Sequence, residues 1–140
     1  MVSSSAATIC VLVVDDNDTN RQLACAILES KGFVCIEAST GAGAIEMVNS
    51  HAPDLVLLDI QLPDISGLEV LARIRAASDL AVRHVKVIAA TALAFPKDRA
   101  LCLGSGCDGY LARPYSSRDL LTTISNVLAG STDLLSASSQ

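Results

Sequence analysis

Apolar residues along the chain gather in five short runs, and segments with a helical pattern separate these runs. The runs cover residues 9–14, 33–37, 54–59, 85–90 and 109–112. Four of the runs are almost continuously apolar rather than alternating, which is typical of strands that are covered on both faces. The pattern therefore predicts five short strands, most of them buried on both sides.

The segments between the runs place apolar residues three or four positions apart, as amphipathic helices do. The expected helices cover residues 18–31, 41–50, 67–77, 97–103 and 117–129. Thr40 and Ser116 are suited to cap the first turns of two helices, and Gly32 and Gly104 stand at the ends of two others as stop signals. Five helices are thus expected, one after each strand.

The order of these elements, a strand followed by a helix five times over, sets the fold class. Right-handed connections make such strands parallel and place helices on both faces of the sheet. We therefore predict an α/β protein with a doubly wound, five-stranded parallel sheet. Its single domain covers residues 9–129, whereas residues 1–8 and 130–140 are expected to be flexible because they are rich in small and polar residues.

The composition argues against two classes of partner. The net charge is −5, and two phenylalanines and two tyrosines with no tryptophan offer few stacking surfaces, so we expect no nucleic acid partner. No apolar stretch approaches the roughly 18 residues of a membrane span, and the start lacks the basic region of a signal peptide. The five cysteines have no C-x-x-C spacing, and we interpret them as free thiols of a cytoplasmic protein.

Polar and charged residues that could take part in chemistry stand at the carboxyl ends of the predicted strands. Asp15 and Asp16 follow the first strand, Asp59 ends the third, Thr91 follows the fourth and Arg113 follows the fifth. In open α/β sheets this edge is where ligands bind. Three carboxylates at close quarters repel one another, and Mg²⁺ with its oxygen ligands would relieve the repulsion. A carboxylate beside Mg²⁺ is a candidate phosphoryl acceptor. Mg²⁺ would bind one phosphoryl oxygen, and the Thr91 hydroxyl and the Arg113 guanidinium would bind the others.

Four stretches of the sequence together resemble the receiver domain of two-component response regulators. They read VLVVDDND, DLVLLDIQLPDISGLEV, ATA and GYLARPY, and the resemblance covers about residues 9–129. Parts of them look most like single-domain regulators of bacterial cell-cycle phosphorelays, and the stretch from ATA to GYL also looks like the receivers of hybrid histidine kinases. The resemblance implies a flavodoxin-like sheet with the strand order 2-1-3-4-5.

The resemblance also implies a role for each residue of the acidic group. Asp59 would be the phospho-acceptor. Asp16 and Asp59 would bind Mg²⁺ directly, Asp15 would act through a water molecule, and Gln61 would contribute its backbone carbonyl. The predicted site is therefore a magnesium-dependent phosphorylation site.

Four positions beyond the acidic group complete the comparison with the family. Thr91 is implied to be the switch hydroxyl, Tyr110 the rotating aromatic residue of the fifth strand, and the bond before Pro114 a cis bond. Arg113 departs from the family pattern, which has lysine there. Arginine is a longer, planar fork that pairs with carboxylates, so we expect Arg113 to bridge to Asp59 without metal and still to neutralise a phosphoryl group.

The predicted function is a signalling switch rather than an enzyme, phosphorylated by a histidine kinase or a histidine phosphotransfer protein. The donor would dock near the first helix. A protein target would bind the face of the fourth helix, fifth strand and fifth helix, with the chain a monomer or a weak dimer. Two alternatives stay open: an unphosphorylated pseudo-receiver, because of Arg113, and an aspartate-dependent phosphatase. The second is disfavoured because Gln61 stands where such enzymes have a second aspartate.

Overall fold

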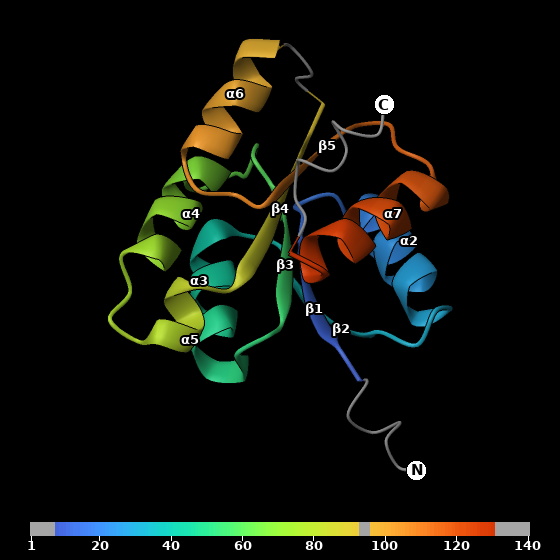
Figure 1. Cartoon of the computed structure of the whole chain (residues 1–140), viewed down its shortest axis with the longest axis horizontal. Helices are drawn as coiled ribbons and strands as arrows, with labels where there is room; N and C mark the ends of the chain where they lie inside the picture. Colours follow the sequence, from blue (N-terminus) through green and yellow to red (C-terminus); the bar gives the residue numbers. More distant parts are fainter. Residues whose placement is uncertain (1–7, 93–95, 131–140) are drawn as a thin grey trace.

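Five parallel strands form the centre of the structure, and helices cover both faces of the sheet (Figure 1). The computed structural model describes residues 8–92 and 96–130. Within these residues the strands are β1 (Cys10–Val14), β2 (Val34–Ala38), β3 (Leu55–Asp59), β4 (Lys86–Thr91) and β5 (Gly109–Ala112). Their order is β2-β1-β3-β4-β5 and each pairing is parallel, which confirms the predicted fold class and strand order.

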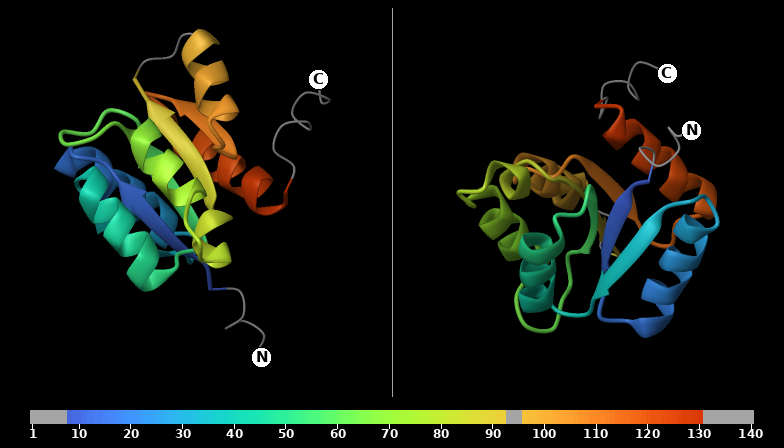
Figure 2. Two further views of the ribbon diagram at one scale, coloured as in Figure 1. Left: turned by 90° about the vertical axis from the view of Figure 1, so that its left-hand side faces the viewer. Right: turned by 90° about the horizontal axis from the view of Figure 1, so that it is seen from below.

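Six helices lie in the described residues, in two layers. They are α2 (Asp18–Glu29), α3 (Gly41–His51), α4 (Gly67–Arg75), α5 (Leu80–Arg83), α6 (Pro96–Gly104) and α7 (Ser117–Leu128). Buried residues of α3, α4, α5 and α6 pack on one face of the sheet, and those of α2 and α7 pack on the other. Figure 2 shows these two layers on either side of the sheet from two further directions.

The expected number of helices, five, was wrong because the sequence pattern did not reveal α5. This helix spans Leu80–Arg83, is capped by the side chain of Asp79 and buries Val82. Four residues make little more than one turn, so they cannot show an apolar repeat. The other five helices fall where the pattern placed them, although α2 ends at Glu29 and α4 at Arg75, each two residues earlier than predicted.

The predicted caps and one predicted stop are present. Thr40 accepts the N–H of Gly43 at 3.0 Å, and Ser116 and Asp119 form a reciprocal capping box at the start of α7. Gly32, three residues after α2, has a φ of +89°, a conformation that glycine adopts without a steric penalty. The local sequence therefore sets where α3 and α7 begin and how the chain leaves α2.

Strand β1 explains why the apolar runs are continuous. Successive side chains of a strand point to opposite faces of the sheet. Val11 and Val13 pack with α2 and α7, whereas Leu12 and Val14 pack with the other helical layer, and all four are at most 2% exposed. Because β1 lies beside β3 with both carboxyl ends at one edge, the residues that follow these strands are brought together.

The two chain ends predicted to be flexible lie almost entirely outside the described part, which leaves out residues 1–7 and 131–140. Across the residues that are described, no helix has the length and apolar character that crossing a membrane requires.

At the opposite edge of the sheet, Arg75 of α4 joins two connections, the one that leads into β4 and the one that leads into β5. Its guanidinium donates to the backbone carbonyls of Gly106, Arg83 and Val85 at 2.9, 2.7 and 2.7 Å. It also forms an ion pair with Asp108 at 3.0 Å, and its side chain is only 22% exposed. The sequence pattern did not single out Arg75, because an arginine near a helix end usually points to water.

Replacing Arg75 by lysine should lower the free energy of unfolding by about 2 kcal/mol, because one ammonium group cannot serve acceptors in several directions. Urea unfolding followed by circular dichroism measures this change. Arg73→Lys is the matched control, since Arg73 lies on the same helix but is 56% exposed and pairs with Glu69 at the surface. That control should change stability by less than about 0.5 kcal/mol. Equal unfolding midpoints for the two variants would contradict the prediction.

Candidate functional site: an acidic edge with one arginine

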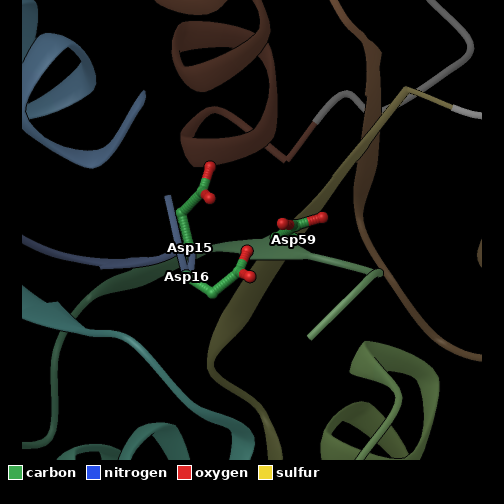
Figure 3. A group of neighbouring side chains, drawn as sticks. All are labelled: Asp15, Asp16 and Asp59. Carbon is green, nitrogen blue, oxygen red and sulfur yellow. The ribbon is translucent and has the colours of Figure 1, made fainter. Parts of the chain in front are cut away.

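Three aspartates meet at the carboxyl edge of the sheet, where the sequence pattern placed them. Asp15 and Asp16 directly follow β1, and Asp59 is the last residue of the neighbouring strand β3. Each offers one carboxylate oxygen, and these oxygens lie within 4.8 Å of one another. Figure 3 shows the consecutive side chains of Asp15 and Asp16 leaving the chain in different directions, with that of Asp16 turned toward Asp59.

Asp59 is almost enclosed, with 3% of its surface exposed. Burial raises the pKa of its carboxyl group, because water no longer stabilises the charged form. Two contacts act in the opposite direction. Its Oδ1 accepts the backbone N–H of Gln61 at 3.0 Å and lies 3.5 Å from Nη1 of Arg113. The backbone of Gln61 therefore lies against the carboxylate, while its side chain is exposed.

Asp15, also buried, holds the shorter contact with the arginine. Its Oδ2 lies 2.5 Å from Nη2 of Arg113, and its Oδ1 accepts the backbone N–H of Asn17 at 2.9 Å. The expected contact between Arg113 and Asp59 is thus present, but the closest partner was not predicted. Because a guanidinium carries two Nη groups, it can pair with two carboxylates at once, and one oxygen of Asp59 is already engaged by a backbone N–H.

The backbone around Arg113 directs its side chain over the acidic residues. Arg113 follows β5 directly, and its N–H donates to the carbonyl of Thr91 at 2.8 Å. The bond between Arg113 and Pro114 is cis, the isomer that the family resemblance implied. Tyr115 then packs against the core beside α7, and this burial raises the pKa of its hydroxyl group. The position of the Arg113 guanidinium therefore depends on the end of β5 and on the turn that follows it.

Thr91 and Tyr110 lie on the two strands beyond β3. Thr91 ends β4 and is 2% exposed, and the preceding residue, Ala90, is the register partner of Asp59. Thr91 is thus next to Asp59 along the edge. Tyr110 lies on β5, is half-buried and packs against the core on the side of α6. The roles of Thr91 and Tyr110 in switching stay predictions.

Arg21 of α2 holds the backbone of the acidic edge, and no sequence pattern singles it out. Its Nη1 donates to the backbone carbonyl of Asp15 at 2.8 Å. The same guanidinium pairs with Glu37 at 2.8 Å and with Asp18 at 2.6 Å. The spacing of Asp18 and Arg21 suggests a helical ion pair, but no local signal reveals the contact with the chain after β1.

The acidic residues fit a hard divalent cation. All three side chains offer oxygen, the donor type that Mg²⁺ prefers, and the exposed carboxylate of Asp16 leaves the edge open to water and to a ligand. The cysteines, which would suit softer metals, belong to other parts of the fold and are free. Within the described residues, no other three histidine, cysteine or acidic side chains lie close enough together to hold a metal ion.

Comparisons with known proteins identify the family of this chain. The family model of the response regulator receiver domain matches residues 11–125. The polar-differentiation response regulators DivK of Brucella ovis and Brucella suis are 37% identical over 118 residues, which cover 84% of this chain and 94% of theirs.

Solved structures give the same result. A CheY-like receiver domain protein from Methanospirillum hungatei has a TM-score of 0.80 at 28% identity, with 89% of this chain and 97% of that one covered. The receiver domain of the Francisella response regulator 1452 has a TM-score of 0.77 at 26% identity, with 85% and 95% covered. The family match spans most of the chain, so the chain belongs to the response regulator receiver domain family.

Proposed function

We propose that this receiver domain is a switch in a phosphorelay and that Asp59 accepts a phosphoryl group from a phosphohistidine. One observation carries the proposal. The buried carboxylate of Asp59 shares the sheet edge with Asp15 and Asp16 within 4.8 Å, and the guanidinium of Arg113 lies 3.5 Å away. A nucleophile, a cluster of oxygen ligands and a fixed cation are the parts that transfer of a phosphoryl group requires.

In the proposed reaction a carboxylate oxygen of Asp59 attacks the phosphorus of the donor. The new O–P bond forms as the N–P bond to the imidazole breaks, and the imidazole nitrogen keeps the electron pair and takes up a proton. Thr91 lies beside Asp59 along the edge, and Arg113 reaches Asp59 from the turn after β5. Both would neutralise or bind the phosphoryl oxygens.

We assign the binding of Mg²⁺ to the acidic edge. Asp16 and Asp59 would hold the ion directly, Asp15 through water, and Gln61 through its backbone carbonyl. The bound ion would offset the negative charge of the phosphoryl group. The all-oxygen donor set supports this assignment, as does the position of the Gln61 backbone against Asp59.

A surface pocket between α2 and the turn after β5 supports docking of the phosphodonor near the first helix. Leu23 lines it from α2, and Arg113, Pro114 and Tyr115 line it from the turn. Leu23 is 59% exposed. An apolar surface beside the reactive residues suits a protein partner, for which we propose a histidine kinase or a histidine phosphotransfer protein.

The target of the switch would bind the face of α6, β5 and α7, which are the fourth and fifth predicted helices and the strand between them. Leu101 and Leu103 on α6 are 55% and 37% exposed, as a protein-binding surface requires. Phosphorylation would move Thr91 toward the phosphoryl group and Tyr110 with it.

We propose that the chain acts in the bacterial cytoplasm as a monomer or weak dimer, without turnover of an external substrate.

The second candidate is a receiver that is never phosphorylated. The contact of 2.5 Å between Arg113 and Asp15 favours it, because this arginine already occupies part of the acidic edge. The two candidate functions differ in one respect. In the first, Asp15 and Asp59 can leave Arg113 to interact with Mg²⁺ and a phosphoryl group, whereas in the second they stay paired with Arg113.

Incubation with acetyl phosphate and Mg²⁺ should add one phosphoryl group to the wild-type chain, as read by intact mass. Asp59→Asn should abolish the gain because an amide oxygen is too weak a nucleophile for this transfer. Glu46→Gln, which changes an exposed carboxylate of α3, should keep it. An unchanged wild-type mass, both with acetyl phosphate and with a phosphorylated histidine phosphotransfer protein, would leave the second candidate standing.

Arg113→Lys should tighten Mg²⁺ binding by about fivefold, equivalent to about 1 kcal/mol, because the shorter ammonium group cannot pair with both buried carboxylates and competes less for them. Isothermal titration calorimetry with MgCl₂ measures the affinity without any phosphodonor. The same substitution at Arg118, which is exposed on α7, is the control and should leave the affinity unchanged. Unchanged or weaker binding in Arg113→Lys would contradict the proposed competition.

A further inference from the structure

The loop of residues 60–66 connects Asp59 to α4, and one of its side chains binds a different helix. Asp64 accepts the backbone N–H groups of Gly41 and Ala42, the first two residues of α3, at 2.8 and 2.9 Å. These two hydrogen bonds lower the pKa of Asp64 to about 2, so the side chain is an anion at the positive end of that helix. The loop after the acceptor aspartate is therefore fastened to α3.

Packing reinforces this attachment at the neighbouring residue. A Cβ atom placed on Gly41 would lie 2.5 Å from Cγ1 of Ile65, so the loop rests directly on the first residue of α3. At the other end of the loop, the N–H of Gly67 donates to the carbonyl of Ile60 at 2.8 Å. A Cβ on Gly67 would lie 2.4 Å from the carbonyl oxygen of Asp59. The loop of residues 60–66 is thus packed closely against the start of α3, and the start of α4 is packed closely against the end of β3.

The fixed loop contacts the acidic edge through Gln61. Its N–H holds Oδ1 of Asp59 at 3.0 Å, so the direction of the acceptor carboxylate depends on where residue 61 lies. Asp64 stands three residues further along the same short loop, and its side chain forms hydrogen bonds with the start of α3 rather than with the acidic group. It can influence that group only by fixing the path of the loop.

We propose that Asp64 is a positioning residue, which holds Gln61 against Asp59 by fastening the loop to the start of α3. The inference rests on the proposed function, in which Asp59 and the Gln61 carbonyl bind Mg²⁺. Loss of Asp64 weakens Mg²⁺ binding and slows acceptance of a phosphoryl group, although Asp64 touches neither the ion nor the reacting atoms.

The start of α3 offers a matched control, because it has two caps with different origins. Thr40 accepts the N–H of Gly43 from within the local chain, whereas Asp64 accepts those of Gly41 and Ala42 from across the fold. Removing either cap weakens the same helix end. Only the removal of Asp64 also releases the loop.

The experiment compares Asp64→Ala with Thr40→Ala in the full chain by urea unfolding, Mg²⁺ titration calorimetry and amide hydrogen exchange without metal. Both variants lose stability. Asp64→Ala weakens Mg²⁺ binding by about tenfold, as loss of a residue that orients metal ligands does, whereas Thr40→Ala keeps it within about twofold. Exchange of the Gln61 N–H becomes faster in Asp64→Ala alone, and Asp64→Asn, which keeps one acceptor oxygen, falls between.

Two results overturn the inference: Gln61 exchange in Asp64→Ala equal to that of the wild type, or an equal loss of Mg²⁺ affinity in the two alanine variants. A wild-type chain that binds no Mg²⁺ is a different failure, since it contradicts the proposed function. Faster Gln61 exchange in Asp64→Ala would in that case still support the positioning role, because the exchange is measured without metal.

Discussion

The repulsion among three carboxylates at one edge of the sheet is the constraint on which this structure depends. Asp15 and Asp59 are both buried, so water cannot screen their charges as it does at the surface. The guanidinium of Arg113 lies 2.5 Å from the first and 3.5 Å from the second and supplies the compensating charge. The turn after β5 thus brings a cation over the acidic edge. Together with the backbone N–H groups of Asn17 and Gln61, this cation offsets part of the repulsion without a metal.

The sheet topology creates this constraint and also makes it useful. Placing β1 between β2 and β3 puts Asp15 and Asp16 beside Asp59, and β4 and β5 then place Thr91 and Arg113 along the same edge. Three residues outside the acidic group fix the backbone around this edge. Arg21 binds the backbone carbonyl of Asp15, Asp64 fastens the following loop to α3, and Thr91 anchors the backbone of Arg113.

The sequence predicted the strands and the acidic edge well, because both follow from the apolar pattern and from the rule that parallel strands share a carboxyl edge. It located Arg113 at that edge but not its closest partner, since position along a strand does not say how far a side chain reaches. Asp64 was missed because QLPDISG resembles an ordinary turn, and its hydrogen bonds join residues more than twenty positions apart. The short helix α5 was missed because one turn shows no periodicity.

The most direct test of the acidic edge as a cation site is the unfolding temperature of the metal-free chain as MgCl₂ is added at constant ionic strength. A ligand that binds only the folded state raises this temperature with its concentration. The unfolding temperature should rise for the wild type and much less for Asp16→Asn, in which the proposed exposed ligand is removed while the contacts of Asp15 and Asp59 with Arg113 are kept. An unfolding temperature of the wild type that does not respond to Mg²⁺ would contradict the proposal that the three aspartates bind this ion.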